Sequence, residues 1–468
     1  MGKRLILILT LAFVVGIAFA AYAEVQNVKV SGDLTVYGIS RNLAMRGGNN
    51  QATENALASI ARVRIDADLT DNVIATVRLL NERYWGNETN NSGTSGVNTD
   101  INLDLAYVTM KEFLYSPLTL TVGRQELHFG NDMILGDPDT NNQVTTASPF
   151  FGTAANGADR DLTARKSFDA VRATLNYDPL VVDIVAAKIN ETGLKPNDDM
   201  DLYGVNLNYN LGKKNTIIEG YFWEKRTGRA ATDPTIRKSS PDTVNTVGAR
   251  VSSEPIENLT AQVEGAFQFG TRVPQTTDTN YTAATPTHAV DRRAFALETM
   301  LTYNWKKVKY NPVTSLCYAY FSGDHENNVV DNNNGAWRGW DPMFENQKFG
   351  DIANALFNQT NAHIIGGIVS MKPVDDVTLK GEYYAFWWAK AYPNGVNVVT
   401  ATARNGTDNY NMTGRRFAGQ EVDLTATYDY TEDVQFGLMG GIFLPGASFA
   451  KANSDTASEV IGSMKVTF

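Results

Sequence analysis

The chain has little of what most metal and cofactor sites require. It contains one cysteine, Cys317, in 468 residues, so neither an intrachain disulfide nor a cysteine-rich zinc site is possible. Its four histidines, at positions 128, 288, 325 and 363, lie far apart in the sequence. The net charge of −10 is modest for this length, and no basic stripe stands out that would suit a nucleic acid. We therefore expect no cofactor, no metal centre and no nucleic-acid partner.

Long apolar segments are also absent beyond residue 24. Charged or polar residues interrupt each apolar run within a few positions, and the mean hydropathy is −0.27. A membrane-spanning helix needs about twenty consecutive apolar residues. The sequence thus excludes a helical transporter of the inner membrane.

One apolar segment does occur, at the N-terminus. Lys3 and Arg4 precede a run from Leu5 to Ala21, and Ala21-Tyr22-Ala23 has the small-x-small pattern that signal peptidase recognises. The run is short for a membrane anchor. We expect residues 1–23 to be a secretory signal peptide, cleaved before Glu24, and residues 24–468 to form one domain.

The strongest pattern in residues 24–468 is a period of two. In residues 61–69, Val63 and Ile65 fall on an apolar face and Arg62 and Arg64 on a polar one. Such alternation indicates a strand with one apolar side. In a membrane barrel the apolar side meets lipid and the polar side lines the lumen. The same pattern places Leu103, Leu105 and Tyr107 on the apolar face of residues 101–113, opposite Asp104.

The connections separate a membrane barrel from a soluble sandwich. Tight turns such as 70–72 and 178–179 alternate with long segments such as 130–167 and 324–361, which are rich in Asn, Asp, Thr and Gly. Short periplasmic turns and long external loops are typical of outer-membrane barrels. We expect an all-β, antiparallel transmembrane barrel of about eighteen strands, near residues 28–38, 59–69, 73–84, 101–113, 118–129, 168–177, 180–190, 201–211, 215–225, 244–253, 258–269, 293–304, 313–323, 362–372, 376–388, 419–430, 433–444 and 458–468.

Aromatic residues recur on the predicted lipid face near strand ends. Such residues form girdles at the two membrane interfaces. The chain also ends in an aromatic residue, Phe468, on the same face. The predicted girdle residues are Tyr107, Tyr177, Tyr209, Phe222, Phe269, Tyr303, Tyr320, Trp387 and Tyr428. The predicted location is the bacterial outer membrane, with its lipid as a partner, and we expect a monomer.

The predicted lumen carries charges of both signs. Alternation turns inward the bases Arg62, Arg64, Arg78, Arg172, Arg250, Lys380 and Lys465, and the acids Asp66, Asp68, Asp104, Asp183, Glu219, Glu264, Glu298, Glu382, Glu421 and Asp423. Acids are at least as numerous as bases, so cross-strand ion pairs are one expectation for this wall. Arg124 falls on the outer face by alternation from Val122. A β-bulge at Gly123 would return Arg124 to the lumen, because glycine in a strand often marks a bulge.

Four stretches of the chain resemble the alginate export family of outer-membrane barrels, in the family's order. Residues 118–136, LTLTVGRQELHFGNDMILG, are similar to its Gly-Arg-Gln-x-Leu segment, and residues 167–172, SFDAVR, to its Phe-Asp-Ala-x-Arg strand. FSGD and WDPMFE lie within residues 320–345. GQEVDL at 419–424 and FLPGASF at 443–449 resemble the C-terminal hairpin. The likeness covers much of residues 118–468, whereas the first hundred residues match only in general character.

This resemblance implies an eighteen-stranded barrel that exports a polyuronate, an anionic polysaccharide, with a possible periplasmic export partner. A conduit for carboxylates should present Arg and Lys. We take as candidate pore-lining residues Arg62, Arg64, Arg78, Asp104, Arg124, Arg172, Arg250, Lys380, Glu421 and Asp423. The mixed charges leave a general diffusion porin as an alternative, and a receptor or adhesin that binds partners through its long loops is a third.

Two further possibilities have weaker support. A rim enzyme would need a catalytic set such as His325 with Asp324, or His128 with Asp132, but the sequence has no Gly-x-Ser-x-Gly elbow. Asp137, Asp139 and Asn141 have calcium-like spacing but lack the following glycine and distal glutamate of a hand-type loop. We therefore expect a channel without catalytic residues.

Overall fold

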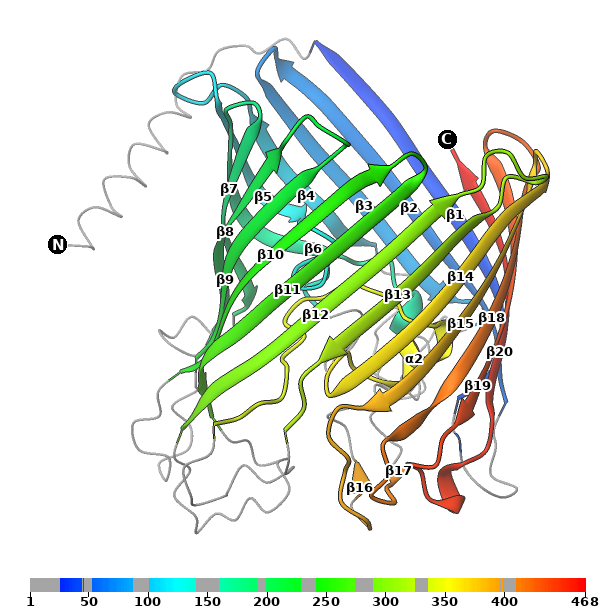
Figure 1. Ribbon diagram of the computed structural model, residues 1–468. Helices are drawn as coiled ribbons and strands as arrows, with labels where there is room; N and C mark the ends of the chain where they lie inside the picture. Colours follow the sequence, from blue (N-terminus) through cyan, green and yellow to red (C-terminus); the bar gives the residue numbers. More distant parts are fainter. Residues whose placement is uncertain are drawn as a thin grey trace.

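The computed structural model describes residues 26–43, 45, 53–86, 101–139, 160–191, 199–228, 241–273, 289–324, 336–395, 397–398 and 410–468. Within these residues the chain forms one closed barrel of eighteen antiparallel strands (Figure 1). The strands are β1 Asn27–Asn42, β2 Glu54–Thr70, β3 Val73–Tyr84, β4 Asn102–Met110, β5 Leu118–Glu126, β6 Ser167–Asn176, β7 Leu180–Asn190, β8 Met200–Asn210, β9 Ile217–Thr227, β10 Asp242–Ile256, β11 Leu259–Arg272, β12 Val290–Asn304, β13 Val313–Phe321, β14 Ala362–Val374, β15 Val377–Trp388, β18 Phe417–Asp429, β19 Val434–Pro445 and β20 Ala457–Thr467.

Each strand pairs with its neighbours in sequence, and β1 closes the ring by pairing with both β2 and β20. The predicted number and order of strands are therefore confirmed. Two short strands, β16 (Asn397–Val398) and β17 (Tyr410–Asn411), form a separate hairpin in the connection between β15 and β18. The short turns lie at the upper end of Figure 1, and the C-terminus lies at the same end. The predicted signal peptide, residues 1–23, and His288, His325 and Asn141 lie outside the described residues.

The outer surface of the barrel is apolar. Leu316 is 67% exposed and Leu103 is 50% exposed, although both lie within strands of the barrel wall. Exposed aliphatic side chains on so many consecutive strands would be unfavourable in water, whereas lipid solvates them. The predicted lipid face is confirmed at Val63 and Ile65, which are also exposed.

Strand β4 departs from the prediction. The register between β3 and β4 shifts between Arg78 and Leu79, so that Asp104 is an extra residue on β4. Such a bulge reverses the alternation beyond it. Leu105 is consequently buried, and the hydroxyl of Tyr107 lies 3.5 Å from the guanidinium of Arg64, inside the barrel. The lipid-facing positions predicted for Leu105 and Tyr107 are therefore wrong.

The other predicted girdle residues lie on the outer face. At the end with the short turns, Tyr177, Tyr209 and Tyr428 are more than 40% exposed, as is Phe468. At the opposite end of the strands, Phe269 is similarly exposed, and the ring of Trp387 packs 5.5 Å from that of Phe417 in a tilted arrangement. The two aromatic belts bracket the aliphatic band, as expected for a barrel that crosses a bilayer.

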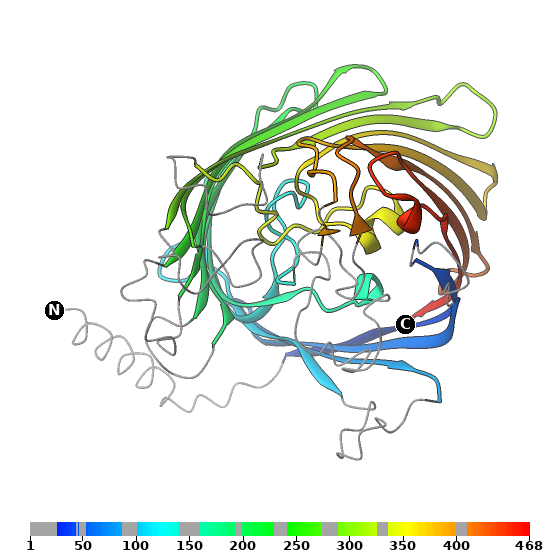
Figure 2. The same ribbon diagram turned by 90° about the horizontal axis from the view of Figure 1, so that it is seen from below.

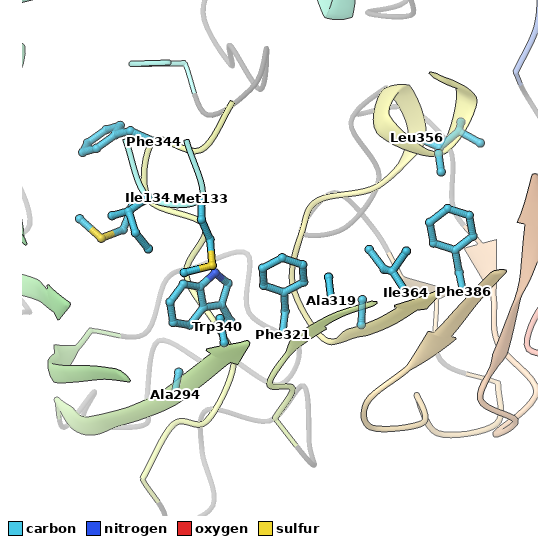
Figure 3. Close-up of a cluster of buried hydrophobic side chains, with 14 of the residues drawn as sticks. Met133, Ile134, Ala294, Ala319, Phe321, Trp340, Phe344, Leu356, Ile364 and Phe386 are labelled. Atoms are coloured by element: carbon cyan, nitrogen blue, oxygen red, sulfur yellow. The ribbon is translucent and has the colours of Figure 1, made fainter. Parts of the chain in front are cut away.

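The core lies inside the barrel. The described parts of loop 3 (residues 127–139 and 160–166) and of loop 7 (residues 322–324 and 336–361) fold into the lumen, where their apolar side chains pack on the inner wall (Figures 2 and 3). Loop 7 contains the helix α2, Asp351–Leu356, and loop 3 contains the turn η1, Arg160–Leu162; a further turn, η2, spans Lys451–Asn453. No helix in the described part of the chain has the length and apolar character needed to cross a membrane.

Candidate functional site: a lumen narrowed by two loops

Loops 3 and 7 meet inside the barrel. Leu135 and Phe344 form a parallel β-bridge, and the Phe344 amide donates to the Ile134 carbonyl at 3.0 Å. In return the amides of Gly136 and Asp137 donate to the Phe344 carbonyl at 2.8 and 3.0 Å. Burial of side chains such as Leu135 and Phe344 stabilises the junction by roughly 1.5–3 kcal/mol each. The described parts of the two loops therefore form one packed unit (Figure 3).

Loop 7 is fastened to one side of the wall through Asp341. Its carboxylate lies 2.5 Å from the ammonium nitrogen of Lys225 on β9 and 3.7 Å from a guanidinium nitrogen of Arg292 on β12. Its backbone exchanges two hydrogen bonds with the side-chain amide of Gln268 on β11, at 2.9 and 2.7 Å. Three strands thus hold a single residue of the loop.

The helix α2 is fastened to another side of the wall. Its N-cap is Gly350, which has no side chain to cap the first amides. Glu421 on β18 accepts the N–H groups of Ile352 and Ala353 at 2.7 and 2.8 Å, and Asp423 lies 3.4 Å from the Asp351 amide nitrogen. Carboxylates at a helix N-terminus accept hydrogen bonds from its free amides and are attracted to the positive end of its dipole. The two predicted pore-lining acids are therefore helix caps.

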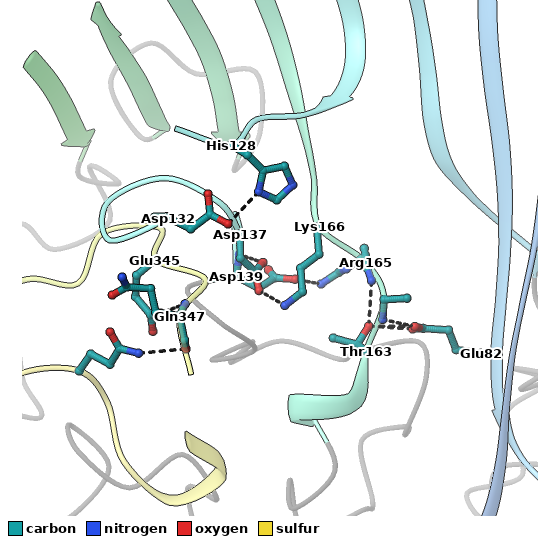
Figure 4. A network of polar contacts seen from close by, with 12 residues as sticks. Glu82, His128, Asp132, Asp137, Asp139, Thr163, Arg165, Lys166, Glu345 and Gln347 are labelled. Carbon is teal, nitrogen blue, oxygen red and sulfur yellow. Dashed lines mark hydrogen bonds and ion pairs between the residues drawn. The ribbon is translucent and has the colours of Figure 1, made fainter. Parts of the chain in front are cut away.

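Loop 3 reaches the wall formed by β1, β3 and β20. Asp161 in η1 receives two hydrogen bonds from Arg41 on β1, at 2.9 and 2.8 Å, and Arg41 also pairs with Glu459 on β20 at 2.9 Å. On β3, Glu82 accepts the Thr163 hydroxyl and the Ala164 amide (Figure 4). Residues 160–166 lead from these contacts into β6, so this part of loop 3 spans the lumen between distant strands.

The aspartates proposed as calcium ligands have other partners. Asp137 pairs with Lys166, and Asp139 pairs with Arg165, within loop 3 (Figure 4). Among the described residues, no group of three or more potential ligands is placed to hold a metal ion. The near-motif at Asp137 and Asp139 is thus part of the fold of loop 3. In the same loop His128 bonds to Asp132 at 3.0 Å.

The predicted basic cluster lies on the lumen side of β2 and β3. Arg64 and Arg78 are directly opposite each other in the register of the two strands. Arg62 pairs with Asp33 at 2.9 Å, Arg64 with Asp66 at 2.7 Å, and Arg78 with Asp104 at 2.5 Å. A second nitrogen of Arg78 contacts Glu126 at 2.5 Å. The structure therefore gathers these three bases, each with an acidic partner.

The remaining predicted bases are distributed around the wall. Arg172 pairs with Asp183 at 2.8 Å, Arg250 with Glu219 at 2.5 Å, and Lys380 with Glu382 at 2.6 Å. The prediction that neighbouring acids and bases pair is consistent with each of these contacts. Such pairs keep polar side chains solvated within a wall and contribute little net stability when partly exposed.

Arg124 is not in the lumen. Val122 pairs with Val171, which is exposed to lipid, and Arg124 pairs with Asp169 two positions further, without a register shift. Gly123 has a φ of 123°, which lets β5 approach β4 closely, but it does not insert a bulge. The guanidinium lies 3.4 Å from the Asp169 carboxylate on the outer face. The assignment of Arg124 to the pore is therefore corrected.

Within several lumenal ion pairs the base is more exposed than the acid. The exposed fractions are 38% for Arg64 against 24% for Asp66, 30% for Arg172 against 5% for Asp183, and 43% for Lys380 against 12% for Glu382. Lys and Arg have longer side chains than Asp and Glu, so their charged ends extend past the carboxylates. A solute in the lumen thus meets the basic member of these pairs first.

Sequence reasoning missed the residues that hold the loops in place. Asp341, Glu82, Arg41 and Glu459 lie far apart in sequence, and each finds its partner only when the barrel closes. The sequence did contain a signal for the anchor of loop 7. The segment WDPMFE, which resembles the alginate export family, includes both Asp341 and Phe344. GQEVDL similarly contains the two helix caps, Glu421 and Asp423.

The geometry defines a transmembrane β-barrel whose lumen is narrowed by its own loops. The family model for alginate export matches residues 28–463. The chain therefore belongs to the alginate export family. It lies in the bacterial outer membrane and forms a channel for polar solutes.

Solved structures share this fold at low sequence identity. OpdQ of Pseudomonas aeruginosa is 12% identical, with a TM-score of 0.54 over 95% of this chain and 99% of that chain. OccK8 (OprE) of the same organism is 10% identical, with a TM-score of 0.53 and the same coverage. OccAB4 of Acinetobacter baumannii is 11% identical, with a TM-score of 0.52, again over 95% and 99%. No curated protein matches the chain.

Proposed function

We propose that this channel prefers anionic solutes and that its specific cargo is an alginate-type polyuronate, carried outward across the outer membrane. The observation that carries the proposal is the exposure of the basic member in lumenal ion pairs, as at Arg64, Arg172 and Lys380. A uronate carboxylate can bond to such a guanidinium or ammonium group without displacing the buried acid. Membership of the alginate export family supports the same cargo.

The cluster of Arg62, Arg64 and Arg78 is the best candidate contact. These residues lie on two adjacent strands, and Arg64 and Arg78 face each other in register. Arg62 and Arg64 keep part of their surface exposed, whereas Arg78 is nearly covered. We therefore assign solute contact to Arg62 and Arg64, and we assign Arg78 the role of holding Asp104 and Glu126.

A general diffusion porin is the second candidate. Each base of the cluster has a carboxylate partner, so the wall has little net charge at longer range. Such a lumen would pass small polar solutes of either sign with weak selectivity. The receptor interpretation is favoured only if the two inward-folded loops block conductance.

Planar-bilayer recordings separate these functions. We expect the purified protein to conduct and a uronate oligomer to block the current. The double variant Arg62→Glu, Arg64→Glu should keep its conductance and lose the block. Arg293→Glu is the matched control, because Arg293 is an exposed arginine beside outward-facing Phe295 rather than in the lumen.

Each result has a distinct meaning. Conductance without block in the unaltered protein would favour the general porin. Block that persists in the double variant would remove Arg62 and Arg64 from the contact. A protein that inserts but does not conduct would favour the receptor.

A further inference from the structure

The turn between β12 and β13 differs from the other short turns of the barrel. It spans residues 305–312, whereas several others are two or three residues long, as at 257–258 and 375–376. Lys306, Lys307 and Lys309 are all exposed on it. No ion pair to these lysines occurs among the described residues; Lys309 lies 4.5 Å from the centre of the Tyr310 ring. The turn therefore presents three positive charges with no acidic partner in the described chain.

A fourth lysine lies beside this turn. The amide of Lys372, at the end of β14, donates to the Tyr310 carbonyl at 3.0 Å, and the Lys372 side chain is exposed. The other short turns differ in charge, because those that follow β2, β4 and β6 carry Asp71, Glu112 and Asp178 with one lysine, Lys111, whereas the turn that follows β8 carries Lys213 and Lys214. Among the short turns of the described chain, the turn 305–312 thus carries the most lysines.

The residues leading to the turn follow the polarity of a bilayer leaflet. Leu301 and Leu316 pair across β12 and β13 and are at least half exposed to lipid. The next outward pair is Tyr303 with Thr314. Trp305 follows, with its ring 4.7 Å from that of Tyr303 and its indole N–H donated to the Thr314 hydroxyl at 3.0 Å.

Aliphatic, aromatic and then basic residues thus succeed one another over a few positions. Tyr and Trp prefer the boundary between lipid tails and headgroups. The three lysines lie one to four residues beyond this boundary, and four residues span at most about 13 Å, so the lysines can reach the lipid phosphates. The short turns are periplasmic in an outer-membrane barrel, so this boundary belongs to the inner leaflet.

We propose that Lys306, Lys307 and Lys309, with Lys372 beside them, form a binding site for anionic phospholipid headgroups of the inner leaflet of the outer membrane. The ammonium groups bind the phosphates, and Trp305 sets the depth of the turn. Charge complementarity requires an anionic partner, and the position of Trp305 at the lipid boundary favours a lipid over an acidic periplasmic protein. The site is separate from the lumen and does not depend on the proposed cargo.

The test compares lipid binding by variants of the full-length protein. The variant Lys306→Gln, Lys307→Gln, Lys309→Gln keeps the length and polarity of the turn. The matched control is Lys213→Gln, Lys214→Gln on the turn before β9, where the Lys214 ammonium already donates to the Pro255 carbonyl at 3.0 Å. Each protein is reconstituted in nanodiscs of phosphatidylglycerol and phosphatidylcholine, and the lipids retained on the protein are counted by native mass spectrometry.

We expect the unaltered protein and the control to retain phosphatidylglycerol over phosphatidylcholine, and the triple variant to lose roughly tenfold or more of that preference. Unchanged retention by the triple variant, an equal loss in the control, or no enrichment in the unaltered protein would overturn the proposal. So would a triple variant that keeps its lipid preference but loses binding to an acidic periplasmic protein. Conductance and uronate block should be the same in all three proteins, which shows that folding is intact.

Discussion

The carboxylate of Asp341 in loop 7 lies 2.5 Å from the ammonium nitrogen of Lys225 on β9. Arg292 contributes a second cation at 3.7 Å. Burial by itself would raise the pKa of Asp341, but these two cations lower it to about 2, below its ordinary value of 3.8. The charged form of Asp341 is therefore the one that fastens the loop to the wall.

The first prediction concerns acid release of loop 7. Because the pKa of Asp341 is depressed, its contribution to anchoring is present above pH 3.8 and is lost as the pH falls through about 2. The variant Asp341→Asn should mimic acid at neutral pH, with a loss of roughly 1.5–3 kcal/mol of anchoring. Single-channel recordings should then show larger current fluctuations. Asp291→Asn, which removes an exposed partner of Arg293, is the control and should leave the current unchanged.

The second prediction concerns the caps of helix α2. Glu421→Leu removes the acceptor for the Ile352 and Ala353 amides, and loss of such a cap costs about 0.5–2 kcal/mol. Hydrogen exchange at these two amides should accelerate, while exchange in the barrel strands should not change. Lys380→Leu is a control on the neighbouring strand that leaves both caps in place. Equal protection of the helix in the variant and in the unaltered protein would contradict the capping role.

The third prediction concerns the turn at the start of loop 3. The hydrogen bond to Asp132 raises the pKa of His128 above its ordinary 6.5, despite the opposing effect of burial. The contribution of the His128–Asp132 pair to the stability of this turn is therefore complete below pH 6.5, and it disappears as the pH rises through the raised pKa of His128. Proteolysis of the loop should be slower at pH 6 than at pH 9. Asp132→Asn should abolish this difference, and if it does not, another group controls the turn.

The fourth prediction concerns the lipid face. Val263→Arg places a charge on a half-exposed position of β11 and should destabilise the inserted barrel by about 2–4 kcal/mol near the midplane. Thr260→Arg lies three residues away on the lumen side, because side chains alternate along a strand and Thr260 pairs with Thr302, which follows the lipid-facing Leu301. Refolding into lipid vesicles should be impaired only in the first variant. Similar behaviour of the two would mean that the faces of β11 are reversed.

Much of the barrel could be predicted because local patterns specify it. A period of two at Val63 and Ile65 marks a lipid face wherever the strand lies in the sheet, and the alternation of short turns with long loops orders the strands. The predicted lipid-facing positions on β4 were wrong beyond Asp104, because a bulge reverses the alternation of side chains and leaves no mark in the composition of the strand. The sequence did not decide which face of β5 carries Arg124. A glycine such as Gly123 is expected both at a bulge and where two strands approach closely.

The sequence by itself determined an eighteen-stranded barrel with a charged lumen, because alternation and turn spacing are written into each hairpin. Only the tertiary structure decided what those charges do. Glu421 and Asp423 cap a helix, and Asp341 joins loop 7 to strands β9 and β12, because ring closure brings together residues that lie 49 to 116 positions apart in the sequence. The physical reason is that an ion pair or a helix cap depends on distance in space, whereas the pattern of a strand depends only on its neighbours in sequence.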